Sequence, residues 1–232
     1  MFTKNFSSSQ ELYQFGLTKS MDTSKDFRIL IAEKGAAELE KLLQNVKVQR
    51  RKELVNLARN LTNEIQILKY SYMPPEELAK SCGNLLNLAS EISKALANAE
   101  EDFNKRLAEY WLDYVSSLPD LFERGEIERI GFAIRYFAGE IVSANKISNK
   151  LWLCVVDCGK RFDVVTNSEK LASSKRVVVS HLPPRKFGDV VSDGMFVDAS
   201  FEKKGELSFE EIRSIADKLG EVEAVLYQIV ER

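Results

Sequence analysis

Two adjacent cations, Arg185 and Lys186, directly follow the dipeptide Pro183-Pro184. Each proline fixes its own φ angle, so we expect a rigid turn that holds both side chains in place. A stiff backbone lowers the entropic cost of ordering a contact, and paired cations of this kind bind phosphate groups. These residues therefore predict recognition of a polyanion, a task that needs no covalent step.

Residues for catalysis or metal binding are scarce. His181 is the only histidine, and we expect it to be a turn residue or an RNA contact. Cys154 and Cys158 are four residues apart in a predicted strand and its end, which is not zinc-ligand spacing, and with Cys82 they predict reduced, partly buried thiols. The chain has no glycine-rich phosphate loop and no nucleophile motif. The sequence thus predicts a protein that is not an enzyme and has no cofactor and no metal site.

Further basic and polar side chains lie near the ends of the predicted strands, and we expect them to line one face. These candidate RNA-binding residues are Lys175, Arg176, Lys160, Arg161, Asn167, Ser192 and His181, in addition to Arg185 and Lys186. Residues 131–200 hold ten Lys and Arg against seven Asp and Glu, a balance of +3, whereas the whole chain carries −2. This local excess favours an anionic partner. Phe162 and Phe187 could stack on bases or pack in the core.

The strands around the cations have a clear pattern. Residues 176–179 are rich in β-branched side chains and predict a half-buried strand. Ser192-Asp193-Gly194 predicts a second turn, and residues 195–197 predict the strand that follows it. The region therefore reads as a strand, a proline turn, a polar loop and a return strand.

These residues resemble a known family, the tRNA-binding domain of bacterial methionyl-tRNA synthetase C-termini and of endothelial monocyte-activating polypeptide II. The family pattern is a V-V-V strand, then L-x-P-x-K, then S-x-G-M. The matching residues here are Val177 to Val179, Leu182, Pro184, Lys186, Ser192, Gly194 and Met195. The resemblance extends upstream through 138–142, 149–159 and 164–167, so that it covers about residues 131–200. It implies a five-stranded oligonucleotide-binding (OB) barrel that binds tRNA.

The chain departs from the family pattern in two places. Residues 146–151 stand where the family has H-P-x-A-D-K-L, and Gly188-Asp189 stands where it often has R-G. An acid therefore lies where a phosphate-facing arginine is expected. Both synthetase class signatures are absent from the sequence, so we do not expect this chain to be a synthetase itself.

Apolar residues at heptad spacing predict helices before residue 120. One seam runs from Leu54 to Tyr72, and a second from Leu78 to Tyr114, with Pro74-Pro75 between them. We expect a long antiparallel coiled-coil hairpin, about 46–72 against 75–116, preceded by a helix over 36–45 and a weakly helical lead-in over 1–24. Lys47, Arg50, Arg51 and Lys52 form a basic cluster at one end of this hairpin, either a solvated helix face or a phosphate contact.

Three segments complete the prediction. Residues 27–32 are compatible with either a strand or a helix. Ser208 to Glu211 forms a capping box that opens a helix to Leu219, with Gly220 as its C-terminal cap. Residues 222–230 also fit a strand or a helix, and a helix is favoured.

The sequence therefore predicts an α+β protein with two domains. Residues 1–130 form the helical domain with its antiparallel hairpin, and residues 131–232 form the OB-fold barrel with a helical extension. The predicted function is non-catalytic binding of tRNA by shape and phosphate backbone, in trans to an aminoacyl-tRNA synthetase, by a cytoplasmic homodimer without membrane contact. The alternative is a scaffold module in which the barrel has lost RNA binding and the hairpin mediates assembly.

Overall fold

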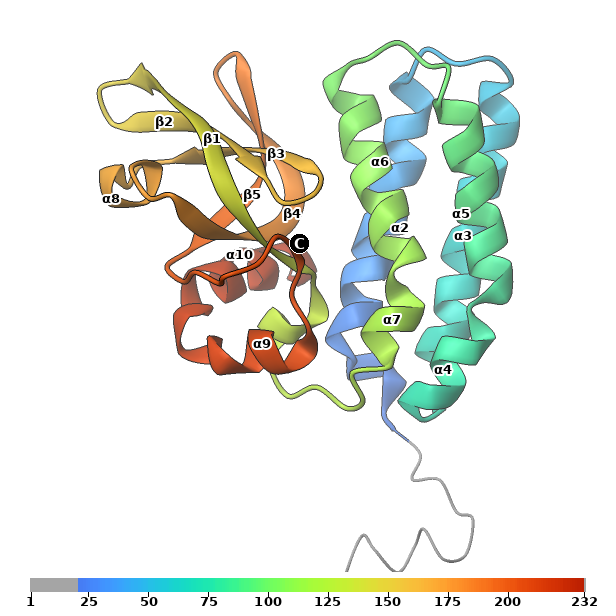
Figure 1. Ribbon diagram of the computed structural model, residues 1–232. Coiled ribbons are helices and arrows are strands. Elements are labelled where there is room, and N and C mark those ends of the chain that lie inside the picture. Colours follow the sequence, from blue (N-terminus) through green and yellow to red (C-terminus); the bar gives the residue numbers. More distant parts are fainter. Residues whose placement is uncertain (1–20, 232) are drawn as a thin grey trace, which may run out of the picture.

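The computed structural model describes residues 21–231 and places a helical part beside an antiparallel sheet (Figure 1). The lead-in expected over 1–24 lies almost entirely outside the described residues, and Thr23–Lys25 forms a short 3-10 helix, η1. The helices that follow are α2 (Phe27–Asn45), α3 (Arg51–Lys69), α4 (Pro75–Ser81), α5 (Gly83–Leu96), α6 (Phe103–Ser116) and α7 (Leu118–Phe122). The ambiguous 27–32 segment is therefore helical.

The predicted antiparallel packing across Pro74-Pro75 is confirmed for α3 and α5, but the second helix does not run on to residue 116, and the helical part is a four-helix bundle. In it α2 packs on α3 and α6, and α5 packs on α3 and α6. The predicted seams are buried, as Leu61 and Leu85 show. However, the second predicted helix is interrupted at residues 97–102. There the Asp102 side chain accepts a hydrogen bond from the backbone N–H of Lys105 and caps the start of α6. This cap lets α6 turn back along α5, so the excess length of the second seam forms the fourth helix.

The sheet contains strands β1 (Tyr136–Ser148), β2 (Leu151–Asp157), β3 (Arg161–Thr166), β4 (Arg176–Phe187) and β5 (Val190–Val197). They pair antiparallel in the order β3-β2-β1-β4-β5, and the short strand β6 (Gly205–Glu206) also pairs with β1. The short helix α8 (Glu169–Ala172) joins β3 to β4.

The expected OB-fold barrel is corrected to an open sheet, since no backbone ladder joins β3 to β5 among the described residues. Side chains bridge these two strands instead. Ser192 Oγ accepts a hydrogen bond from Val165 N at 2.9 Å, and Asp193 Oδ2 accepts one from Asp163 N at 3.0 Å. The edges are therefore adjacent although their backbones do not pair.

Neither of the two turns predicted around the cations, at 183–184 and at 192–194, is present. Pro183 and Pro184 lie within β4, where the pairing with β5 is irregular between His181 and Arg185. Proline lacks an N–H, so it can lie in a strand only where a ladder bond is missing. The reversal comes instead at Gly188-Asp189, where Gly188 has φ +63°, and residues 192–194 belong to β5.

The C-terminal segment packs beneath the sheet in Figure 1 as three short helices, α9 (Phe209–Ser214), η3 (Ala216–Lys218) and α10 (Gly220–Val230). The predicted capping box at Ser208 and Glu211 is confirmed, and so is the helix over 222–230. Gly220 was wrongly predicted as a helix end, because it begins α10.

Two hydrophobic cores hold the fold together, and β4 contributes to both. Val177 and Val179 point into the sheet's own core, with Phe162. Val178 and Leu182 point the opposite way, into a larger core that also contains the bundle and α10. Side chains alternate across a strand, so β4 is the element that joins the two cores.

Candidate nucleic-acid interface

Arg185 and Lys186 lie beside the tip of the β4–β5 hairpin, and both are exposed. The guanidinium carbon of Arg185 is 5.7 Å from the ring centroid of Phe187, and Lys186 Nζ is 4.7 Å from the ring of Phe103 in α6. Cation–π contacts of this kind hold a side chain in position without neutralising its charge. Both cations therefore remain available to an anion.

The structure separates the other predicted cations from this hairpin. Lys175 and Arg176 lie at the opposite end of β4, nine residues from Arg185, or about 30 Å along a strand. Arg176 also forms ion pairs with Glu140 and Glu202. Lys175 is exposed, but the six cations do not line one face as expected.

Lys160 and Arg161 lie at the turn into β3, and each contacts an acidic side chain nearby. Lys160 Nζ is 4.5 Å from the ring of Phe137 and 3.9 Å from Asp113 Oδ2 of α6, and burial lowers its pKa. Arg161 forms an ion pair with Asp163 at 2.9 Å. Lys160 therefore belongs to the contact between the sheet and the bundle.

His181 lies in that same contact, with its side chain 14% exposed. Its ring centroid is 4.8 Å from that of Tyr110 and 5.3 Å from that of Phe162, and its Nδ1 is 3.5 Å from Asp113 Oδ2. Burial, together with the charge of Lys160, lowers the pKa of His181 to about 3. His181 is therefore neutral at pH 7 and lies between α6 and the sheet.

Of the two polar candidates, Ser192 is buried. Its hydroxyl accepts from Val165 N and donates to the carbonyl oxygen of Gly194. Its hydrogen-bonding capacity is thus used in bridging β3 to β5. Asn167 follows β3 and is exposed.

The sequence reasoning missed two features of the sheet. Arg106 of α6 binds Asp193 through two hydrogen bonds of 2.8 and 2.6 Å and fixes the bundle to β5. On the β1–β2 hairpin, Lys146 Nζ lies 5.3 Å from the ring of Trp152. The two-residue turn at Asn149-Lys150 sets the register that places Lys146 opposite Trp152. This turn was the sequence signal from which the contact could have been predicted.

The three cysteines are free and buried, as predicted for reduced thiols. Burial raises the pKa of Cys82 to about 11 and that of Cys158 to about 12, so both thiols stay protonated at pH 7. Within residues 21–231, no group of three His, Cys, Asp or Glu side chains could hold a metal ion. No helix in this part of the chain is long and apolar enough to cross a membrane.

Comparison with known proteins adds one finding. Residues 20–125 match a family described as "Alpha helical domain", a segment that corresponds to the bundle from η1 to α7. No curated protein matches the chain. The family description names a structure and no activity.

Proposed function

We propose that this protein binds structured RNA of the tRNA class through the sheet of residues 131–200, without chemistry. The observation that carries the proposal is the strand order β3-β2-β1-β4-β5, with β5 returning to lie against β3. An oligonucleotide-binding fold is a five-stranded, partly open Greek-key barrel. The order and the side-chain bridges support an open form of that fold.

The arrangement of the hairpins also supports RNA binding. In Figure 1 the β1–β2 and β4–β5 hairpins rise at the end of the sheet opposite α9 and α10. The first carries Lys146 against Trp152, and the second carries Arg185 and Lys186. Cations attract the phosphate backbone, while half-exposed aromatic rings offer stacking surfaces to unpaired bases.

The proposed phosphate contacts predict how binding depends on salt. A polyanion held by several cations releases counterions on binding, so its affinity falls steeply as salt rises. An RNA-binding protein of this kind would act in the cytoplasm, as a tRNA-binding partner of an aminoacyl-tRNA synthetase. The homodimer stays a prediction, which sedimentation at tens of micromolar would check.

The experiment is a gel shift with total tRNA, first at low salt and then across a salt series. We expect a shift that weakens as salt rises. The double variant Arg185→Ala with Lys186→Ala should bind several-fold more weakly, while its stability changes by no more than about 0.5–1 kcal/mol, because both side chains are exposed. The matched control replaces Arg213 and Lys218, two exposed cations near α9, with alanine.

A wild-type protein that does not shift tRNA at low salt would contradict the proposal. Unchanged affinity in the folded Arg185 and Lys186 variant would instead remove that hairpin from the interface.

A specific observation favours a second candidate, a scaffold module without RNA binding. Arg161 and Arg176 are engaged by carboxylates, and Asp189 lies at the tip of the β4–β5 hairpin. These acids reduce the positive potential of the sheet. The gel shift separates the two candidates, because a scaffold would leave tRNA unshifted.

A further inference from the structure

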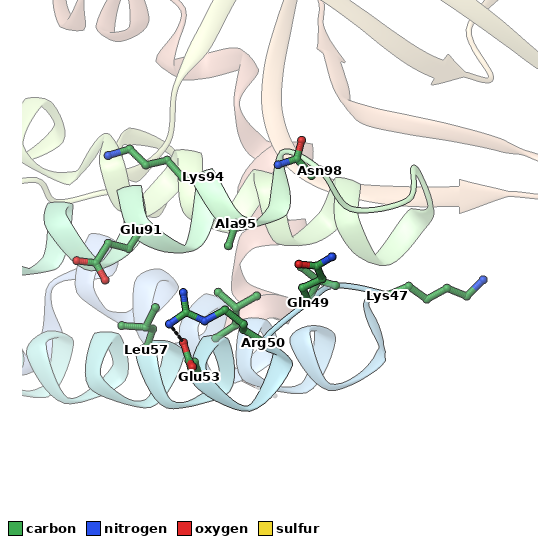
Figure 2. Close-up of a pocket in the computed structure, with 11 residues that line it drawn as sticks. Lys47, Gln49, Arg50, Glu53, Leu57, Glu91, Lys94, Ala95 and Asn98 are labelled. Carbon is green, nitrogen blue, oxygen red and sulfur yellow. Dashed lines mark ion pairs between the residues drawn. The ribbon is translucent and has the colours of Figure 1, made fainter.

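A cavity lies on the bundle, between the α2–α3 loop, the start of α3 and the end of α5 (Figure 2). It is an open groove of about 870 Å³. Lys47, Gln49 and Arg50 line it from the loop, and Lys94 and Asn98 line it from α5 and the residues that follow. All five side chains are exposed.

The lining of this groove combines four apolar residues, Val48, Leu54, Leu57 and Ala95, with three cations, two acids and two amides. The cations are Lys47, Arg50 and Lys94, and the acids are Glu53 and Glu91. Lys47 also pairs with Glu100, which lies outside the lining. Arg50 and Glu53 form an ion pair of 2.5 Å between side chains that are 76% and 58% exposed. An exposed pair of this kind contributes little, so an incoming phosphate could replace Glu53 at small cost.

Outside the groove, the next two residues of the chain, Arg51 and Lys52, are also exposed. The amide side chains of Gln49 and Asn98 can donate to phosphate or ribose oxygens and accept from ribose hydroxyls. The groove therefore offers the mixture of cations and amides that binds a sugar-phosphate backbone.

The groove lies at the same end of the molecule as the β4–β5 hairpin. Lys47 reaches Glu100 in the α5–α6 connection at 2.9 Å, and Phe103, three residues later, holds Lys186 of the hairpin. Figure 1 shows the α2–α3 loop, the α5–α6 connection, and the β1–β2 and β4–β5 hairpins at this end. The α5–α6 connection is thus the bridge between the two cationic sites.

From this geometry we infer that the groove is a second RNA contact, which binds the phosphate backbone of the RNA that the sheet holds. The inference rests on the proposed function and deepens it. Because α6 and the α5–α6 connection separate the two sites, a short single strand cannot occupy both. The ligand class is therefore a folded RNA broad enough to span the bundle and the sheet.

The test compares two triple variants of the full chain with the same change in charge. The groove variant carries Lys47→Gln, Arg50→Gln and Lys94→Gln. The control variant carries Lys80→Gln, Arg213→Gln and Lys218→Gln, which are exposed cations at the opposite end of the molecule. Every replaced side chain is exposed, so both variants should unfold at the wild-type temperature.

We expect the groove variant to bind total tRNA at least several-fold more weakly than the control variant. Its slope of log affinity against log salt should fall by about 2, because up to three phosphate contacts are lost. A single-stranded oligonucleotide of about eight nucleotides, within the reach of one OB fold, should bind both variants equally. A variant that keeps Arg50 and carries Lys47→Arg and Lys94→Arg has all three charges and should bind tRNA as wild type does.

Equal tRNA affinity of the two triple variants would overturn the inference and leave the proposed function standing, provided that the Arg185 and Lys186 variant binds weakly. A second result would also overturn it: a polyglutamate peptide binds the groove variant more weakly than the control variant, while tRNA binds both equally. The groove would then bind an acidic protein. A wild-type protein that binds no tRNA overturns the inference together with the proposed function.

Discussion

At the scale of single residues, His181 is the group whose surroundings differ most from the sequence expectation. It was predicted at a turn or against RNA, and it lies between Tyr110 and Asp113 of α6 and Phe137 and Phe162 of the sheet. These contacts of His181 could not be predicted from the sequence, because they depend on how the bundle packs against the sheet. Arg185 and Lys186 are exposed although they lie in β4 and not on the predicted turn, since two cations beside a hairpin tip rarely find enough partners to be buried.

The burial of His181 predicts how stability depends on pH. Its folded pKa, about 3, is below the ordinary value of 6.5. The unfolded chain therefore takes up a proton first, and the stability present above pH 6.5 is lost as pH falls towards 3. The charged groups facing the ring are Asp113, Lys160 and Arg135.

The variant His181→Leu should remove this part of the pH dependence. Between pH 7 and pH 4 we expect wild type to lose about 1–3 kcal/mol more unfolding free energy than the variant. Urea unfolding at both pH values measures the difference, and the carboxylates titrate in both proteins. Because the chain has one histidine, an equal loss in both proteins would show that His181 is not buried as a neutral ring.

At the scale of elements, helices and strands could be predicted better than the way they end and join. The apolar seams of α3 and α5 and the β-branched start of β4 were read correctly from periodicity. The break after α5 was missed because residues 97–102 keep the apolar spacing, and its one local signal is Asp102, whose side chain caps the start of α6. Pro183-Pro184 was read as a turn because the local rule ignores a strand irregularity that accommodates proline.

The contact between β3 and β5 carries the element-scale prediction. Ser192→Ala removes the acceptor of Val165 N, and a buried N–H without a partner costs about 1–3 kcal/mol. We expect that loss of stability, with faster hydrogen exchange at the Val165 amide than at amides of the β1–β2 ladder. Ser143→Ala, on half-buried β1, is the matched control and should change stability by less than about 0.5 kcal/mol. Unchanged exchange at Val165 would mean that β3 and β5 are held by other contacts.

At the scale of the whole molecule, the two parts share one core. Val178 and Leu182 of β4 pack in the same cluster as Leu61 of the bundle and Leu226 of α10. Polar contacts reinforce this docking, because Arg106 binds Asp193, and Arg135 binds both Asp113 and Glu206. The predicted boundary at residue 130 is a change of architecture, and the larger core continues across it.

A shared core predicts that damage inside the bundle also destabilises the sheet. Gly35 of α2 is the place to test this, because a Cβ there would lie 2.2 Å from Cε3 of the buried Trp111 ring of α6. Gly35→Ala should therefore cost about 1–3 kcal/mol, although alanine alone favours a helix. Gly83→Ala at the start of α5 meets nothing within 4 Å and serves as the control.

For Gly35→Ala we expect one unfolding transition at a lower temperature, seen equally by helical circular dichroism and by hydrogen exchange of β4 amides. Gly83→Ala should leave both signals near wild type or slightly raise them. If Gly35→Ala instead melted the helices while β4 amides stayed protected, the bundle and the sheet would be separate folding units. The groove and the hairpins would then have no fixed spacing, whereas one cooperative unit holds both cationic sites at the fixed spacing that the proposed contact with one folded RNA requires.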